Sequence, residues 1–248
     1  MLSDHGDVAQ TRIIGGHMVM LHVQRWGLGR ELYRETQDAD LGIAPVAVKD
    51  GEIISALLDA GYERAAGNRF VRDVQDIPLT LRDGDQPKTQ AAIDILTPAY
   101  RSRARDNVKI SDDLTTTEVL GLALALKRPG IELELTLQRI NGDIHDVRLV
   151  VPDEVSALVL KVLAWWRRSA AKDAVDIWRL LEVSFAAGLG PVDFKRAWSG
   201  ADEVLADAFS VIEDPAMKAI AAAGPLNDEA RRERHTRIRA LIQRLLPD

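Results

Sequence analysis

Two aspartates stand two residues apart at the start of an otherwise apolar segment, in the stretch RETQDADLGI. In a β-strand the side chains alternate between the two faces, so Asp38 and Asp40 would share one face. Leu41 and Ile43 would then point to the opposite face, into a core. Two neighbouring carboxylates repel each other and are costly to bury. The pair therefore predicts a positively charged group between them.

Carboxylates in this arrangement can hold hard cations. Mg²⁺ prefers one or two carboxylates together with phosphate oxygens and water, and a third acid would allow a two-metal site. Asp94 is the candidate, because it stands between Ile93 and Ile95 in the apolar segment AAIDILTP. The alternative for Asp38 and Asp40 is a solvent-facing edge strand, and for Asp94 a capped or salt-bridged strand end.

Two cations occupy an apolar helical stripe in the C-terminal half. Lys161 and Arg168 fall on one helix face among small and apolar residues. They would suit an anionic triphosphate across a cleft, and Asp173 and Asp176 on the next helix could orient them. The alternatives are that Lys161 only extends past a core stripe, and that the two aspartates stabilise their own helix or pair locally.

The hydrophobic pattern predicts the elements that must position these residues. Strands are expected at residues 11–14, 38–43, 69–74, 77–81 and 91–96. Helices are expected between them at 17–24, 50–60 and 115–127, with 97–113 as a linker or mobile loop. The Asn141-Gly142 turn predicts a hairpin of strands 131–139 and 145–151. Further helices are expected at 153–168, 171–187, 191–198, 201–213, 215–223 and 227–246.

This order of elements predicts an α+β protein with two domains. Residues 1–151 would form a mixed sheet with flanking helices, and residues 152–248 an all-helical bundle that closes a cleft. The full length of 248 residues is enough for such cores without disulfide support.

Composition excludes several kinds of chemistry. The chain has no cysteine, which rules out disulfides, thiolate catalysis and cysteine-based zinc sites. Its net charge of −6 argues against a protein coated in nucleic acid by bulk electrostatics. No apolar run reaches the ~20 residues that span a bilayer, and the acidic start is unlike a signal peptide. We therefore expect a cytoplasmic protein with no membrane partner.

These motifs together resemble the nucleotidyltransferase superfamily of polymerase-β type. The shared pattern is a Gly-Gly after the first strand, Arg-x-Thr-x-Asp-x-Asp on the next strand, and a later apolar-Asp-apolar strand. More narrowly, the chain looks like the AbiE-type toxin nucleotidyltransferases of bacterial type IV toxin–antitoxin systems. That likeness comes from LVLKVLAWWRRSAAKDAVDIWRLLE, which is similar to the family's lysine-bearing helix and the Lys/Arg-Asp-x-x-Asp helix after it. The resemblance covers about residues 11–185.

The resemblance implies roles for residues around the first two strands. Gly15 and Gly16 match the turn that lets the backbone approach the triphosphate, where relatives often have Gly-Ser instead. Arg34 and Thr36 match the substrate-binding positions before the first acid, with the hydroxyl expected near the phosphates.

The resemblance also covers the acids and the helical cations. It implies a metal-binding pair, Asp38 and Asp40, and a third carboxylate, Asp94, that completes the metal site or acts as a base. On the helices, Lys161 matches the lysine that neutralises phosphate charge. The second helical motif is matched by Lys172, Asp173 and Asp176.

The implied activity is that of a Mg²⁺- or Mn²⁺-dependent nucleotidyltransferase. It would move a nucleoside monophosphate from an NTP onto a tRNA or protein acceptor, release pyrophosphate, and be neutralised by a separate antitoxin protein. Two alternatives remain: a small-molecule, antibiotic-type nucleotidyltransferase, and a catalytically silent module that binds a nucleotide or a partner. The presence of all three acids favours an enzyme over the silent module.

Overall fold

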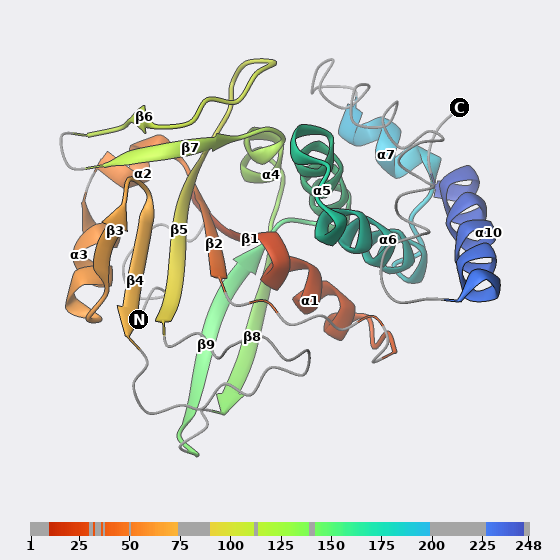
Figure 1. The fold of residues 1–248 in the computed structure, drawn as a ribbon, viewed down its shortest axis with the longest axis horizontal. Helices are drawn as coiled ribbons and strands as arrows, with labels where there is room; N and C mark the ends of the chain where they lie inside the picture. The colour runs from red at the N-terminus through yellow and green to blue at the C-terminus, as the bar shows by residue number, and fades with distance from the viewer. Residues whose placement is uncertain are drawn as a thin grey trace.

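The computed structural model describes residues 10–29, 32, 36, 38–49, 51–73, 90–111, 114–138, 142–198 and 227–245. Within these residues the chain is an α+β protein, with a mixed sheet, a separate hairpin and a group of helices (Figure 1). None of the described helices is both long and apolar enough to cross a membrane. The expected strand 77–81 and the expected helices 201–213 and 215–223 lie outside the described residues.

The mixed sheet places the strands with candidate acids next to each other. Its main path runs in the order β1 (Thr11–Ile14), β2 (Asp38–Ile43), β5 (Gln90–Pro98), β4 (Arg69–Asp73) and β3 (Glu63–Ala66). Strand β2 runs parallel to β5, whereas β1 and β4 are antiparallel to their neighbours. From Leu96 of β5 onward, β7 (Thr115–Val119) pairs in parallel, and β6 (Val108–Lys109) is antiparallel to β7.

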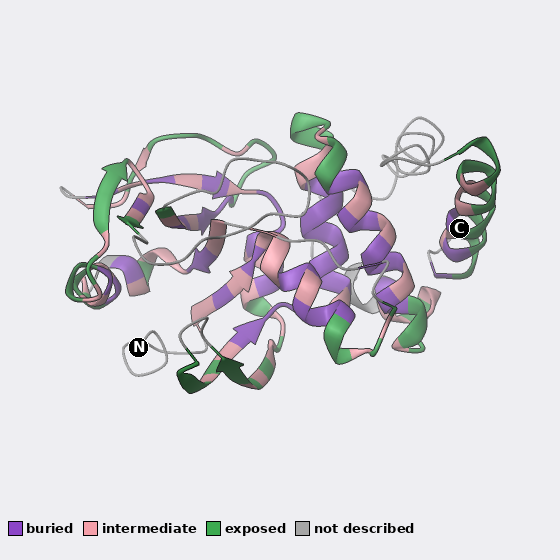
Figure 2. Cartoon of the chain, turned by 60° about the horizontal axis from the view of Figure 1, so that its bottom comes forward, coloured by how far each residue is buried: buried purple, intermediate pink, exposed green. Residues whose placement is uncertain are grey.

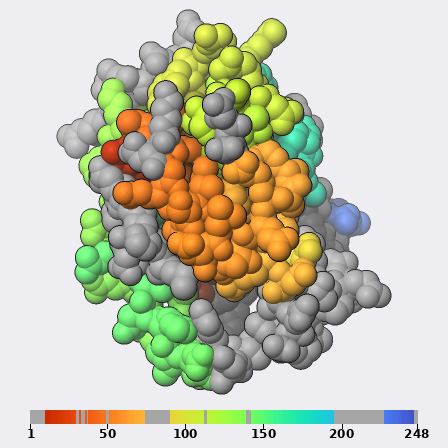
Figure 3. Space-filling view, turned by 90° about the vertical axis from the view of Figure 1, so that its left-hand side faces the viewer, coloured from red at the N-terminus to blue at the C-terminus, as the bar shows by residue number. Residues whose placement is uncertain are grey.

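The alternation of β2 follows its sequence. Leu41 and Ile43 are buried in a cluster with Phe70 and Ile95, against the short helices α2 (Pro45–Lys49) and α3 (Glu52–Asp59). Strands β3 and β4 and helix α3 form much of the surface on this side of the molecule (orange in Figure 3). One face of the sheet is therefore fixed by apolar packing, and the side chains between these residues must point to the other face.

The opposite face of the sheet packs against a larger cluster of buried apolar residues, which come from both halves of the sequence. It contains Met18 of α1 (Gly15–Arg25), Leu122 of α4 (Leu122–Lys127), Leu158 of α5 (Glu154–Arg168) and Leu180 of α6 (Ala171–Ala186). Figure 2 shows this buried region in α1, α5 and α6. Helix α5, which carries both Lys161 and Arg168, is thus packed into the same core as α1, the helix that follows β1.

The C-terminal helices agree with the expected pattern. Helix α5 begins after Pro152, and the Asp153 side chain accepts a hydrogen bond of 2.9 Å from the backbone N–H of Ser156, which caps the helix. Helices α6, α7 (Pro191–Trp198) and α10 (Asp228–Leu245) begin and end within two residues of the expected bounds. The hairpin of β8 (Ile131–Gln138) and β9 (Ile144–Val151) is also confirmed.

The expected helix at 115–127 is wrong in its first half. Residues 115–119 form strand β7, and helix α4 begins only after Gly121, whose φ is +81°. The run of three threonines favours a strand because β-branched side chains suit the pleat. Thr116 is buried and its hydroxyl lies 2.7 Å from that of Thr97 on β5, a contact that a helix would not allow.

The expected linker at 97–113 is also more structured than its composition indicates. Its first residues belong to β5 and its later residues form β6. Between them, Arg105 donates to both carboxylate oxygens of Glu118 on β7, at 2.7 and 3.2 Å. Those bonds hold the pKa of Glu118 below its usual value. Strand β3 was not predicted from the sequence.

Helix α10 is attached through both an apolar seam and its arginines. Ile238, Leu241 and Leu245 are buried, as the spacing indicates. Arginine side chains lie over rings of α6: Arg234 over Trp178 at 4.2 Å, and Arg237 and Arg244 over Phe185 at 4.8 and 5.1 Å. Arg237 also donates to Glu182 at 2.7 and 2.9 Å. Part of the basic face of this helix is therefore used to dock it.

Candidate active site

Three aspartates from two paired strands lie on one face of the sheet. In the parallel register of β2 and β5, Asp38 is opposite Ala92 and Asp40 is opposite Asp94. Because residues at paired positions point to the same side, Asp38, Asp40 and Asp94 share the face that is turned away from the Leu41 and Ile43 cluster. The structure thus brings together the three acids that were selected from the sequence.

The positive group between these acids is Arg69 on β4. Its Nη1 donates to Oδ2 of Asp94 at 2.8 Å, and its Nη2 donates to Oδ1 of Asp38 at 3.0 Å. One guanidinium therefore bridges carboxylates from two different strands. A cation was expected here from the sequence, but Arg69 was not identified as that cation. The sequence gives little indication of this role. Arg69 can be identified only when the pairing of β4 with β5 is known, because that pairing places Arg69 opposite Asp94.

Asp40 lies against the first residue of α1. Gly15 has a φ of +68°, and a Cβ at this position would be 1.8 Å from Oδ2 of Asp40. Burial raises the pKa of Asp40, while the charges of Lys161, Arg168 and Lys172 act in the opposite direction. The Gly-Gly turn therefore has a specific function in this structure: it leaves room for an acid that is largely withdrawn from water.

Gly15→Ala should therefore be more destabilising than an ordinary left-handed glycine substitution. A non-glycine residue at positive φ costs about 1–2 kcal/mol, and overpacking against Asp40 adds roughly 1–3 kcal/mol. The measurement is the free energy of unfolding in urea. Gly27→Ala is the matched control, because Gly27 follows the same helix with a φ of +60°, and a Cβ added there would have no neighbour within 4 Å. Equal losses in the two variants would contradict close packing of Gly15 on Asp40.

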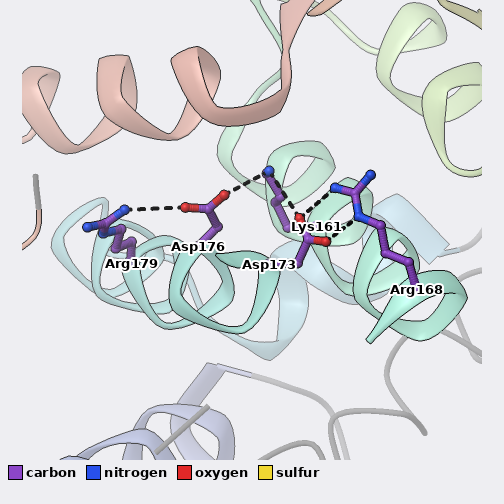
Figure 4. A network of polar contacts seen from close by, with 5 residues as sticks. All are labelled: Lys161, Arg168, Asp173, Asp176 and Arg179. Atoms are coloured by element: carbon purple, nitrogen blue, oxygen red, sulfur yellow. Dashed lines mark hydrogen bonds and ion pairs between the residues drawn. The ribbon is translucent and has the colours of Figure 1, made fainter. Parts of the chain in front are cut away.

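The helical cations and acids form one network, which is buried except for the half-exposed side chain of Arg168 (Figure 4). Lys161 Nζ lies 2.8 Å from Asp176 and 3.5 Å from Asp173. Arg168 donates to Asp173 at 2.5 and 2.8 Å, and Arg179 donates to Asp176 at 3.3 Å. Both aspartate side chains are fully buried. The network joins the two helical motifs of the sequence, and it includes the local pairing of Asp176 that was the alternative expectation, with Arg179 as the partner.

The electrostatics of this network favour the charged form of Asp173. Burial alone would raise the pKa of Asp173, but the hydrogen bond from Arg168 and the charge of Lys161 lower it below its usual value overall. Lys161 itself is 5% exposed, so it is held inside the fold and does not extend to solvent. Lys172, by contrast, is exposed.

A cavity of about 470 Å³ lies between the acidic strands and α5. Asp40, Asp94 and Arg69 line it on the strand side, and Arg167 and Arg168 line it on the helix side. Its volume is within the range of ligand pockets, roughly 300–1,000 Å³. The strand wall of the cavity therefore carries carboxylates together with the guanidinium of Arg69, and the helix wall carries two further guanidinium groups, an arrangement suited to a ligand with both anionic and cationic groups.

Arg167 closes one side of this cavity. Its Nη2 donates to both carboxylate oxygens of Asp106 at 2.8 Å, and its Nη1 donates to the carbonyl of Glu118 at 3.3 Å. These contacts attach the loop after β5 to helix α5. The cavity is thus bounded by segments that are far apart in the sequence.

Two further predicted site residues are described by the structure, and neither lines the cavity. Gly16 is in the first turn of α1, and the half-buried Thr36 lies two residues before β2. Arg34 lies outside the described residues.

The acids are a chemically suitable set for a hard cation, although a guanidinium now bridges two of them. Among the described residues, no group of three or more His, Cys, Asp or Glu side chains is arranged to hold a metal ion. Arg69 offers a physical reason, because it occupies the space between Asp38 and Asp94. The same contact demonstrates that these two carboxylates can bind one positive group together. Asp38, Asp40 and Asp94 are therefore the residues that could hold a divalent cation.

Comparison with known proteins identifies no relative: neither the family models nor the curated sequences match the chain. Its function must therefore be inferred from its residues and their geometry.

Proposed function

We propose that the chain is a Mg²⁺- or Mn²⁺-dependent nucleotidyltransferase of polymerase-β type, similar to the AbiE toxins. It would transfer a nucleoside monophosphate from an NTP to an acceptor and release pyrophosphate. The observation that carries the proposal is the shared face of Asp38, Asp40 and Asp94, with the cavity between them and the cationic helix α5. The proposed division of the chain is a catalytic domain at 1–151 and a helical domain at 152–248.

Phosphate binding is assigned to the first turn of α1, which lies against Asp40, and to cations of α5. The first turn of α1, with Gly15 and Gly16, offers backbone N–H groups and the positive end of a helix dipole beside Asp40. Arg168 lines the cavity, and its charge acts on Asp40 together with that of Lys161. These groups would neutralise the triphosphate and orient it, which is most of the work in phosphoryl transfer.

The acids would hold the cation and manage the acceptor proton. A divalent cation held by Asp38, Asp40 and Asp94 would polarise phosphoryl oxygens and make an acceptor hydroxyl more acidic. Burial raises the pKa of Asp94, although Arg69 opposes this shift. A carboxylate with a raised pKa is better suited to accept a proton from the hydroxyl. Asp94 is therefore the proposed base.

The proposed acceptor is a tRNA or a protein, and the proposed partner is an antitoxin, as in the AbiE family. A small-molecule acceptor is the alternative within the enzyme class. The catalytically silent binding module has one specific observation in its favour, namely the bridge that Arg69 makes between Asp38 and Asp94. A site that no longer bound a cation could use an arginine in this way.

One assay separates these functions. The purified chain is incubated with each α-labelled NTP, Mg²⁺ or Mn²⁺, and total RNA or lysate. A nucleotidyltransferase transfers the label covalently to RNA, protein or a small molecule and releases pyrophosphate. A parallel incubation with γ-labelled NTP tests for a kinase, which would transfer that label instead, and NTP binding without pyrophosphate release would indicate the silent module. Either result would reject the proposed activity.

A further inference from the structure

Arg69 is placed where a bound cation would compete with it. It stands opposite Asp94 in the pairing of β4 with β5, and its two terminal nitrogens contact Asp94 and Asp38 separately. The two carboxylates belong to different strands, so a single charged group draws them together. Neither carboxylate can give all its oxygens to a metal ion while the guanidinium remains there.

We propose that Arg69 competes with the divalent cation for Asp38 and Asp94, and so sets the cation affinity of the site. This inference rests on the proposed function and concerns the regulation of the same site. In the cation-free protein, Arg69 neutralises the repulsion between the acids and keeps them in position. When a cation binds, the guanidinium leaves both carboxylates.

The environment of Arg69 permits this movement. Its side chain is 35% exposed, and the side chains of Asp38 and Asp94 are 36% and 19% exposed. Ion pairs that are partly open to solvent are weak and exchange partners readily. The arginine side chain is long, has several rotatable bonds and borders the cavity. It can therefore rotate into the cavity and change partners without unfolding β4.

The cavity offers Arg69 a second anionic partner. Arg69 already lines the cavity together with its neighbours Gly67 and Asn68. A planar guanidinium binds phosphate in the same two-pronged way as it binds a carboxylate. A triphosphate in the cavity would therefore attract Arg69 away from the acids and free them for a cation. Arg69 would then couple nucleotide binding to cation binding.

Cation affinity can be measured without any reaction. The full chain is titrated with Mn²⁺ in the absence of nucleotide, and free Mn²⁺ is followed by electron paramagnetic resonance. If Arg69 holds the acids in roughly nine molecules out of ten, its removal should tighten Mn²⁺ binding about tenfold. We expect that gain in Arg69→Ala and a smaller gain in Arg69→Lys, because one ammonium cannot bridge both carboxylates as the fork does.

Two further variants identify the origin of the effect. Arg72→Ala is the matched control: Arg72 is on the same strand, but its guanidinium donates to the carbonyl of Ala60 at 3.0 Å and lies over Tyr62 at 5.0 Å. Its Mn²⁺ affinity should equal that of the wild type. Adding Asp94→Asn to Arg69→Ala should remove most of the gain, because a ligand is then missing.

Unchanged or weaker Mn²⁺ binding in Arg69→Ala would overturn the inference and make Arg69 a permanent clamp. If that variant does not fold, as judged by circular dichroism, Arg69→Lys decides between the same two outcomes. If the wild type transfers label and the Arg69 variants bind Mn²⁺ as tightly as the wild type does, only the inference that Arg69 competes with the cation is rejected. Absence of both Mn²⁺ binding and transfer in every form would reject the proposed function as well.

Discussion

Asp40→Asn is expected to reduce nucleotide transfer by at least about a hundredfold, while the chain remains folded. The amide has the shape of the carboxylate, so it can keep the contact with Gly15, but it lacks the charge that would hold a cation. Burial raises the pKa of Asp40, which means that the charged form is disfavoured in the fold. Removing this charge should therefore leave the free energy of unfolding unchanged or increase it.

The measurements are the initial rate of label transfer and the urea unfolding curve. Asp59→Asn is the matched control, because Asp59 is an exposed acid at the end of α3. It should change neither quantity. Transfer at the wild-type rate in Asp40→Asn would exclude the three-acid site as the catalytic centre. Loss of folding would instead mean that the Asp40 carboxylate has a structural role beyond its contact with Gly15.

Lys161→Met should have a large effect on stability. The change removes a charge that lies 2.8 Å from Asp176 and 3.5 Å from Asp173, both fully buried. Breaking a buried pair by removing one partner typically costs about 3–5 kcal/mol. The lower end is expected, because Arg168 still binds Asp173 and Arg179 still binds Asp176. Urea unfolding of the purified variant provides the value.

The exposed Lys172 offers the control for this change. Lys172→Met should alter stability by less than about 0.5 kcal/mol. Combining Lys161→Met with Asp176→Leu should restore part of the loss, since replacing a whole buried pair by apolar residues is often neutral or stabilising. If Lys161→Met is as mild as Lys172→Met, the network has no structural importance, and its charges are better explained by ligand binding.

Local patterns were enough to predict the elements that carry the site. Asp38 and Asp40 are at the start of a strand because Leu41 and Ile43, in alternation with them, have an apolar cluster to fill. The helices with Lys161 and Asp173 were likewise recognisable from spacing, and the cap at Asp153 marks where the first of them begins.

Contacts between segments that are far apart in the sequence could not be predicted from local patterns. Arg69 bridges the acids only because β4 pairs with β5 in one register, which depends on the whole sheet. The segment 115–119 was assigned to a helix because the apolar spacing after it is helical, whereas its pairing with β5 makes it a strand. In both cases the pairing with β5 decides the outcome, and local spacing does not reveal that pairing.

The attachment of α10 affects where a nucleic acid or another polyanion could approach. Guanidinium groups at 234, 237 and 244 already lie over aromatic rings, and one is also paired with Glu182. Cations engaged in this way contribute less to the counterion release that drives binding to phosphates. The C-terminal helix would therefore contribute less to the binding of an RNA acceptor than its number of arginines indicates.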